Sequence, residues 1–349
     1  MDEMIAQLKA ELATTLTMEY SLAEKPYRMP ALPHAQVIVL PLVREVVAPM
    51  LVRNNDPDSI TDIVMVRERR VRMIASKTKS VEKRRGAMIL RALQLGGNGA
   101  ANKFFINEKN HQRPSTVFDL NSVIFGDSAK GNGKAIYPVH AAALYSDAIS
   151  VQPASTQTDA VFRQGGIMED GSNYDPEQHQ SSSNIFTTRS VKPGTLFVQT
   201  IVLPGRRITE AAFDHLLLAL GPAGSYGGST ATTGTNLRTY LAGIYWGTLE
   251  KAVNAPMVIL ESLPTPPPTT PNALINHMET LFAQAYPRHI TAQSAEAYVS
   301  ELATQLEARA PRLLTQYAQG AQDAAELFDA WFMKTEKRGR EKGGAEGTE

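Results

Sequence analysis

The sequence predicts an α+β fold built on the element order βαββαβ, the order of a ferredoxin-like or RRM-like sheet. Three observations lead to this prediction. Residues 36–47 form a β-branched run typical of a strand, residues 80–95 carry a helical stripe, and residues 182–222 contain two strand-like runs followed by a helix. A strand-like stretch at 237–250 completes the order, and large insertions separate the elements. Many unrelated functions use this fold, so it assigns none by itself.

The first elements follow from short signals. Residues 1–35 are expected to form an arm that begins as an amphipathic helix, with apolar residues at Ile5, Leu8, Leu12 and Leu16. In the strand at 36–47, Pro41 and the later Pro49 indicate a sheet edge or a bulge. Ser80 is predicted to cap the next helix, and Gly96-Gly97 to end it.

Residues 97–160 are predicted to be a long inserted segment. An insertion of this length between core elements is more often functional than incidental. Within it, 115–125 and 135–151 resemble strands on either side of a turn at 126–134. Residues 162–179 are polar and contain glycine, which indicates another loop.

The remaining elements follow in sequence. Two strands are predicted around the turn Lys192-Pro193-Gly194, and a helix at 208–222 is stopped by Gly221-Pro222. The run 255–264 resembles one more strand, and residues 263–271 form a proline-rich linker. The last helices are predicted within 272–337, at 272–286, 292–309 and 312–337, and the tail 338–349 is expected to be disordered.

Composition bounds the class of protein. At 349 residues and 43% hydrophobic content, the chain can bury a large core. Lys plus Arg equals Asp plus Glu at 35 each, so a nucleic-acid surface would need segregated charge. The absence of cysteine excludes disulfides and thiol nucleophiles. No apolar run approaches the length of a membrane span, and we expect a cytoplasmic protein.

The stretch 67–91 concentrates positive charge, and the predicted helix would place Lys83, Arg84 and Arg85 in its first turn. Cations there oppose the helix dipole, at a cost of roughly 0.3–1 kcal/mol each, whereas an anionic partner would reverse that sign. A solvated basic face is the simpler interpretation. Nucleic acid is the sharper one, because phosphates supply most of the affinity for basic surfaces.

Catalytic motifs are weak throughout the sequence. The histidines lack metal-site spacing, and AGSYG at 223–227 follows a predicted helix where a nucleophile elbow requires a strand. In GDSAKGNGK, Asn132 stands where a P-loop needs lysine. These observations predict no metal, no cofactor and no NTPase activity. The glycine-rich stretch 221–234 is either a flexible connector or a loop that approaches phosphates closely.

The order of several segments resembles a known family. VREVVAPMLVR, the basic stretch VRERRVRMIASKTKSVEKRRGAMILRAL, FDLNSVIFGDS, ALYSDAISV, IFTTRSVKPGTLFVQTIVL and SYGGSTATTGT are similar to the repeated backbone subunit of type I-D CRISPR effector (Cascade) complexes, in the RAMP superfamily. The resemblance covers roughly residues 36–262.

The resemblance implies a hand-shaped subunit with an RRM-like palm over residues 36–262, inserted fingers and a thumb hairpin. Copies of the chain would stack head to tail along one guide RNA, the crRNA. The implied partners are that RNA, a target DNA or possibly RNA strand, further copies of the chain, and the large, small and cap subunits of the complex. Segment 97–150 is the favoured location of the thumb.

The resemblance also implies RNA-binding residues, in the basic stretch and in the glycine-rich loop. They are Arg44, Arg67, Arg69, Arg70, Arg72, Lys77, Lys79, Lys83, Arg84, Arg85, Ser225, Tyr226, Gly227, Gly228, Ser229, Thr232, Asn236 and Arg238.

Three hypotheses remain open at this point. The leading one is a non-catalytic scaffold that binds guide RNA and leaves recognition to base pairing. The second is a stand-alone RNA-processing nuclease of the same superfamily, and the third is a self-assembling protein without nucleic acid. Related complexes cleave bound strands through a loop aspartate, for which Asp56, Asp58 and Asp62 are the candidates.

Overall fold

The structure is a computed structural model. It describes residues 2–14, 37–52, 60–65, 68–95, 118–130, 136–164, 174–175, 180–181, 185–205, 208–228 and 234–343. The helices are α1 (Asp2–Ala10), α2 (Ala75–Ala92), α4 (Leu120–Phe125), α5 (Ala154–Gln157), α6 (Glu210–Leu220), η2 (Ala252–Asn254), α8 (Pro256–Glu261), α9 (Pro271–Ala285), α10 (Ala292–Glu307) and α11 (Pro311–Gly343). The strands are β1 (Val37–Val46), β2 (Asp62–Val64), β3 (Arg69–Met73), β4 (Asp127–Lys130), β5 (Ile136–Val139), β6 (Leu144–Tyr145), β7 (Ala148–Pro153), β8 (Thr158–Gln164), β9 (Tyr174–Asp175), β10 (Gln180–Ser181), β11 (Ile185–Val191), β12 (Leu196–Leu203), β13 (Ala223–Gly224), β14 (Leu237–Leu241), β15 (Ile244–Gly247) and β16 (Arg288–Ile290).

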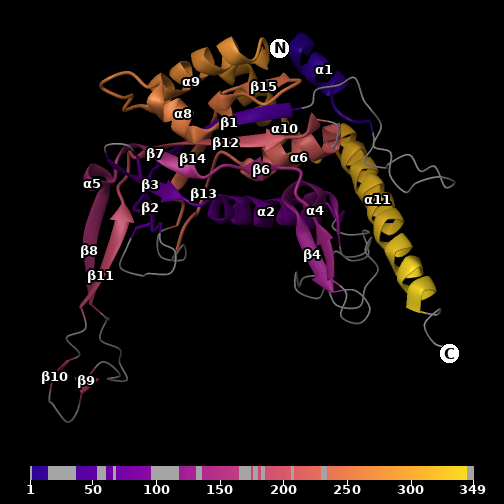
Figure 1. Ribbon diagram of the computed structural model, residues 1–349, viewed down its shortest axis with the longest axis horizontal. Helices are drawn as coiled ribbons and strands as arrows, with labels where there is room; N and C mark the ends of the chain where they lie inside the picture. Colours follow the sequence, from indigo (N-terminus) through magenta and orange to yellow (C-terminus); the bar gives the residue numbers. More distant parts are fainter. Residues whose placement is uncertain are drawn as a thin grey trace.

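An antiparallel sheet with the strand order β13-β14-β1-β12-β7-β3-β2 forms the centre of the molecule (Figure 1). Four neighbouring strands of this sheet, in the spatial order β14-β1-β12-β7, form a unit with helices α2 and α6. Along the chain these elements follow the order β1-α2-β7-β12-α6-β14, so the unit has the arrangement of a ferredoxin-like βαββαβ fold. The predicted α+β fold class is therefore confirmed.

One strand of the predicted unit was assigned wrongly. The two strands on either side of the Lys192–Gly194 turn are β11 and β12, as expected, but β11 leaves the central sheet and pairs with β8. The second strand of the unit is β7, which lies inside the stretch predicted as an insertion. Local pattern identified both strands, whereas pairing depends on residues far apart in the sequence.

Strand β1 is buried because both faces of the sheet are covered. Ile38, Leu40 and Leu42 pack into a core with helices α2, α4, α6, α10 and α11. Val37 and Val39 face the opposite core, beneath α8 and α9. The strand therefore reads as a continuous apolar run instead of an alternating one.

Pro41 lies in this central strand and not at an edge. Its carbonyl accepts a hydrogen bond from Ala242 N, 2.8 Å away, at the point where β14 ends and before β15 begins. In an antiparallel ladder the N–H and C=O of one residue face the same neighbour. The missing proline N–H therefore faces an interruption in the partner strand, where no ladder hydrogen bond is lost.

Two segments predicted as strands are helices. Residues 120–125 form α4, whose Asp119 side chain accepts the Ser122 N–H in a capping box. Residues 256–261 form α8, with Pro256 at its first turn. In both cases a short apolar run between core elements is compatible with either structure, and the N-terminal signal decides it.

Two hairpins project from the sheet on the side where α2 lies (Figure 1). One pairs β8 with β11 and carries the small β9–β10 ladder beyond it, so the loop predicted at 162–179 is partly strand. The other pairs β4 with β5. Helix α2 lies between them in Figure 1.

The C-terminal helices pack on the sheet. Helix α9 covers one face, while α10 and α11 join the core on the other, so residues on both sides of the linker share these cores. Helices α9 and α10 lie where the sequence predicts them, and α11 continues to Gly343, past the predicted end at 337. None of the described helices combines the length and apolar character that a bilayer crossing requires.

Candidate nucleic-acid interface

The basic helix α2 begins earlier than predicted. Its first residue is Ala75, whose N–H donates to Asp147 Oδ1 at 2.8 Å, and Ile74 occupies the N-cap without a side-chain bond. Lys83, Arg84 and Arg85 therefore lie in the middle of the helix and not in its first turn. The predicted conflict with the helix dipole does not arise, because that effect is confined to the terminal turns.

Several cations of the basic stretch are bound to carboxylates. Arg69 donates to Asp62 at 2.9 Å, Arg72 Nε donates to Asp147 at 2.6 Å, and Arg70 pairs with Glu68. Lys83 lies 3.2 Å from Asp127 and donates to Gly126 O. Much of the apparent positive charge is thus neutralised within the chain, which a count along the sequence cannot reveal.

Lys79 is held against the protein. Its ammonium donates to Ala143 O at 3.3 Å and lies over the Tyr145 ring. Burial, together with the neighbouring charge of Lys83, lowers the pKa of Lys79. This side chain is less available to a strand than its place in the basic stretch suggests.

Arg85 caps the end of another helix. Its guanidinium donates to Ala219 O at 2.8 Å, to Ala223 O at 2.9 Å and to Leu220 O. The first and third of these carbonyls belong to the last turn of α6 and the second follows it, at the end of a helix where a cation is favourable. A Cβ built on Gly221 or Gly224 would lie 2.5 or 2.4 Å from this guanidinium. The first glycines of the glycine-rich loop therefore make room for Arg85, which has a structural role at the end of α6, and its assignment as an RNA contact stays a prediction.

Arg44 is fully buried, with 0% exposure, which corrects its assignment as an RNA contact. It pairs with Glu82 at 2.8 Å and donates to Gln199 Oε1 at 2.6 Å and Thr239 Oγ1 at 3.0 Å. Burial is the largest single influence and acts against the charged form, but Glu82, together with Tyr226 and Tyr145, holds the pKa of Arg44 above its ordinary value. Arg44 therefore belongs to the core.

The same carboxylate anchors the glycine-rich loop. Tyr226, fully buried, donates its hydroxyl to Glu82 Oε1 at 3.1 Å, and Tyr145 donates to Oε2 at 2.6 Å. Burial and Glu82 raise the pKa of Tyr145 well above its usual range. Base stacking by Tyr226 is thus excluded in this arrangement.

Asn236 and Ser225 hold the loop closed. The Asn236 side chain accepts the Tyr226 N–H and donates to Tyr226 O, both at 2.8 Å, and it is itself buried. Ser225 donates to Gly234 O at 2.5 Å. Their polar groups are used within the chain, so we correct Asn236 from an RNA contact to a loop brace.

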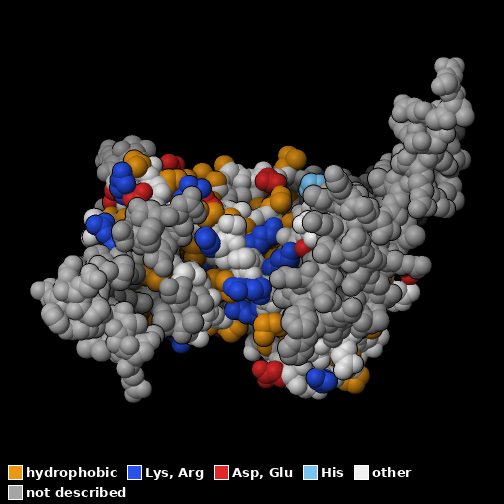
Figure 2. Space-filling model, turned by 90° about the horizontal axis from the view of Figure 1, so that it is seen from below, with side chains coloured by type: hydrophobic (Ala, Val, Ile, Leu, Met, Phe, Trp, Pro, Cys, Tyr) orange, Lys and Arg blue, Asp and Glu red, His pale blue; other side chains and the backbone are white. Residues whose placement is uncertain are grey.

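The outward side of α2 is the surface that remains. Its exposed residues recur at the helical period and include two cations and a large apolar side chain, Met88, with 66% exposure. This set, the outward stripe, is Ser76, Lys77, Ser80, Arg84, Met88 and Ala92. Lys77 and Arg84 have no hydrogen-bond or ion-pair partner for their side chains among the described residues. Figure 2 shows Lys and Arg side chains gathered across the middle of this side of the molecule, with hydrophobic side chains between them.

Other predicted residues are placed as follows. Arg238 is exposed on β14 and interacts with Tyr240, while Gly227 and Gly228 lie against Leu51. Asp62, a candidate for strand cleavage, is bound to Arg69. The remaining predicted residues, Arg67, Ser229, Thr232, Asp56 and Asp58, lie outside the described residues.

Two buried titratable side chains of α6 have shifted pKa values. Asp214 accepts from the Tyr298 hydroxyl and from Gln316 at 2.7 Å, and burial raises its pKa to about 6. The neighbouring His215 contacts Tyr317 and Asn121, each at 3.2 Å, and burial lowers its pKa to about 3. Both side chains bind helices together within the core. Within the described part of the chain, no cluster of His, Asp and Glu could hold a metal.

Sequence reasoning missed two important residues. Asp147 both caps α2 and binds Arg72, and Met88 is an exposed methionine in a basic helix. A turn aspartate gives no distinctive signal. An apolar residue in a predicted helix is ordinarily assigned to the buried side, so the sequence does not indicate that Met88 is exposed.

The fold and the outward stripe define a class: α+β proteins with a ferredoxin-like sheet, large inserted hairpins and an exposed basic helix. A family model described as Csc2 Crispr matches residues 52–323. Since the match covers most of the chain, the protein belongs to the Csc2 Crispr family. The resemblance to the backbone subunits of CRISPR effector complexes is confirmed at this level.

A solved structure agrees in fold. The chain is similar to the crystal structure of Thermofilum pendens Csc2, with 13% identity, a TM-score of 0.58, and coverage of 96% of this chain and 98% of that one. It is also similar to a chain of a CRISPR RNA-guided surveillance complex in a pre-nicking state, with 11% identity, a TM-score of 0.47, and coverage of 76% and 99%. A comparison with curated proteins found no match.

Proposed function

We propose that this chain is the crRNA-binding backbone subunit of a type I-D CRISPR interference complex, and that copies of it polymerise along the guide RNA. The observation that carries the proposal is the outward stripe, because it presents cations that have no partner among the described residues, in a family of CRISPR proteins. Membership of the Csc2 Crispr family supports crRNA and other subunits of the complex as partners. The outward stripe supports contact between this chain and RNA phosphates.

The stripe suits a strand whose sequence is not read. Lys77 and Arg84 are separated by two helical turns, about 10 Å along the axis, so both can contact phosphates of one backbone. Ser76 and Ser80 add hydroxyl groups beside them. Phosphate contacts of this kind position a strand without specifying bases, which fits a guide that recognises its target by pairing.

The projecting hairpins supply the remaining parts of the proposal. The resemblance implies a thumb hairpin, and two hairpins project on the side of α2 (Figure 1). The β4–β5 hairpin lies within segment 97–150, and the β8–β11 hairpin is a second candidate. The two hairpins flank the path that a strand would take along α2, and the exposed Met88 lies on that path. Met88 can press against a base, since its side chain is apolar and unbranched.

Co-expression with a guide array tests the proposal. We expect the purified protein to carry RNA of uniform length, seen as a high ratio of absorbance at 260 nm to that at 280 nm and as one band in a denaturing gel. Particles viewed by electron microscopy should show repeated subunits along that RNA.

Protein that is free of RNA after co-expression, and that does not bind the guide at low salt, would refute the proposal. A single-turnover assay on guide precursor separates it from the nuclease hypothesis. Cleavage by the purified chain alone would favour the nuclease.

A further inference from the structure

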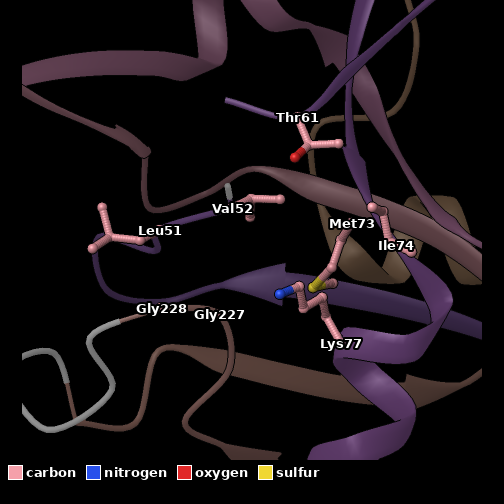
Figure 3. A pocket seen from close by; sticks show the side chains of 8 residues that line it. All are labelled: Leu51, Val52, Thr61, Met73, Ile74, Lys77, Gly227 and Gly228. Atoms are coloured by element: carbon pink, nitrogen blue, oxygen red, sulfur yellow. The ribbon is translucent and has the colours of Figure 1, made fainter. Parts of the chain in front are cut away.

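The two sides of the central sheet offer different surfaces. A pocket of about 230 Å³ lies at the start of α2 (Figure 3), and Lys77 of the outward stripe lines it, so the pocket belongs to the interface already described. Helices α8 and α9 cover the other side of the sheet, away from α2 (Figure 1). The connection between these two helices carries a chemistry that RNA binding does not use.

This connection contains the proline run, which is residues 264–270. Four of its seven residues are proline, and Pro271 follows as the first residue of α9. Proline fixes its own φ near −65° and restricts the residue before it to extended conformations. Thr270, which precedes Pro271, accordingly has a φ of −119° and a ψ of 147°. The bond between Thr265 and Pro266 is cis, and the three consecutive prolines begin there. The backbone of the run is therefore largely confined to extended conformations.

Both ends of the proline run are fixed to the body of the protein. Before it, the Ser262 hydroxyl donates to Ile259 O at 2.7 Å, at the end of α8. After it, the Thr270 hydroxyl accepts the Ala273 N–H at 3.4 Å and caps α9. Ile259 and Leu274 belong to the same apolar core, so α8 and α9 are held together without the run.

The proline run itself makes few contacts with the rest of the chain. All of its residues are exposed except Pro267 and Pro268, which are half-buried. Gln152 Nε2 donates to Pro268 O at 3.4 Å, and Thr270 O accepts from Leu274 N at 3.2 Å. The other carbonyls of the run have no hydrogen-bond partner within the described residues. Proline rings and available carbonyl groups are therefore presented together to solvent.

The stiffness of the proline run is not needed to connect α8 with α9, because their shared core already fixes both helices. A flexible loop of similar length would join them at little cost. Stiffness is useful to a binding partner, since a segment that is already extended loses little conformational entropy when it is bound. The composition of the run therefore favours recognition over connection.

The chemistry of the proline run defines the kind of partner. Extended proline-rich segments bind grooves that are lined by aromatic side chains. Trp and Tyr rings pack against proline rings, and their N–H or O–H groups can donate to the carbonyls between them. The nearest charged residues along the chain are Glu261 before the run and Glu279 after it, and Glu261 is exposed. An acidic groove would repel Glu261, so the groove that fits is uncharged or basic at that end.

We propose that the proline run is a docking site for a separate protein, through a groove lined by Trp or Tyr side chains and free of acidic residues where it meets Glu261. The run lies on the side of the sheet away from α2 (Figure 1), so this protein can bind while the outward stripe is occupied. The inference goes beyond the proposed function and does not depend on RNA binding.

Photo-crosslinking tests the inference on the full chain. A photo-crosslinking amino acid replaces the exposed Thr269, and the protein is incubated with an extract of the cells in which it occurs. We expect one crosslinked protein, and mass spectrometry should locate the crosslink beside Trp or Tyr residues of that protein. An excess of a synthetic peptide of residues 261–272 should abolish the crosslink, whereas a peptide of the same composition in scrambled order should not.

A substitution of the three consecutive prolines gives a second measurement. In the triple variant Pro266→Ala, Pro267→Ala and Pro268→Ala, the crosslink yield should fall about tenfold, as for loss of a main contact at an interface. Pro287→Ala removes an exposed proline outside the run and is the matched control, which should keep the full yield.

Several outcomes would overturn the inference. They are the absence of any crosslinked protein, a crosslink to a second copy of this chain or to RNA, and a crosslinked site without Trp or Tyr. Equal competition by the ordered and scrambled peptides would do the same, and this measurement needs no variant to fold. An unchanged yield in the folded triple variant would show that the prolines are not what the partner recognises.

Discussion

The charged residues on the inner side of helix α2 and those on its outward stripe differ completely in environment, although they alternate along the same sequence. Glu82 and Arg85 face inward and are bound to Arg44 and to the end of α6. Lys77 and Arg84 face outward and have no partner for their side chains in the described part of the chain. The comparison shows that a cation becomes available to a ligand through its direction on the helix, and not through its membership of a basic stretch.

This difference predicts opposite consequences of substitution. Inner residues should affect the free energy of unfolding and leave the salt dependence of RNA binding unchanged. Outward residues should do the reverse.

Removing Glu82 is expected to have the largest effect. In Glu82→Ala, the buried Arg44 guanidinium loses its carboxylate, and breaking a buried pair in this way costs about 3–5 kcal/mol. Tyr226 and Tyr145 lose their acceptor as well. Chemical denaturation of the purified variant measures the loss.

The double variant Arg44→Met with Glu82→Leu is the control. It removes both charges, so it should recover much of the lost stability. A loss below about 1 kcal/mol in Glu82→Ala would show that the inner pair is not what fixes α2 to the sheet.

A pH-dependent effect is expected from the buried groups of α6. The folded pKa of Asp214, about 6, lies above its ordinary 3.8, so the folded state retains a proton that the unfolded state releases, and stability falls as pH rises from about 4 to 6. His215 acts in the opposite direction, because its pKa of about 3 lies below the ordinary 6.5 and stability rises with pH between these values. The two slopes overlap and largely cancel.

Asp214→Asn should therefore reveal the slope of His215. We expect the free energy of unfolding to rise with pH more steeply than in the unmodified protein, by about 1.4 kcal/mol per pH unit between about pH 4 and 6. Over that interval the difference approaches about 3 kcal/mol. Equal slopes in the two proteins, measured by denaturation across this range, would contradict the assignment of Asp214.

Replacing Arg85 should have a smaller effect. In Arg85→Ala, the carbonyls at the end of α6 lose their charged donor, which corresponds to a loss of about 2 kcal/mol. The salt dependence of RNA binding should stay as in the unmodified protein. Arg85→Lys is the conservative control and should retain part of the stability, since one ammonium cannot reach all of these carbonyls. A stable Arg85→Ala variant with a changed slope of log affinity against log salt would show that Arg85 contacts RNA, as Lys77 and Arg84 are expected to.

Much of the fold was predictable from local pattern. The apolar run of β1 and the Thr209-capped helix α6 carry strong signals, and both form where expected. The pairing of β11 with β8 was not predictable, because nothing in either strand specifies its partner. Helices α4 and α8 were mistaken for strands, since their apolar runs are too short to show a period.

The candidate site was predictable only as a region. The sequence located the basic stretch, but it could not distinguish Arg84 from Arg85. The Arg84 side chain is exposed, whereas the adjacent Arg85 side chain is bound to backbone carbonyls. It also proposed Tyr226 and Asn236 as RNA contacts, whereas they brace the loop from inside. The sequence prediction began α2 at Ser80 instead of Ala75, so Ser76 and Lys77 of the outward stripe fell outside the predicted helix.

Arg84→Ala gives the smallest change in stability and the sharpest test of the comparison. Arg84 is exposed and has no partner among the described residues, so its removal should alter the free energy of unfolding by no more than about 0.5 kcal/mol. Loss of one phosphate contact should nevertheless make the slope of log affinity against log salt less negative by about 0.7, equally for guides of different sequence. Fluorescence titrations at several salt concentrations measure this, with Lys251→Ala as the control on the opposite side of the sheet. An altered preference among guide sequences would mean that the outward stripe reads bases, and an unchanged slope would mean that the strand does not follow α2.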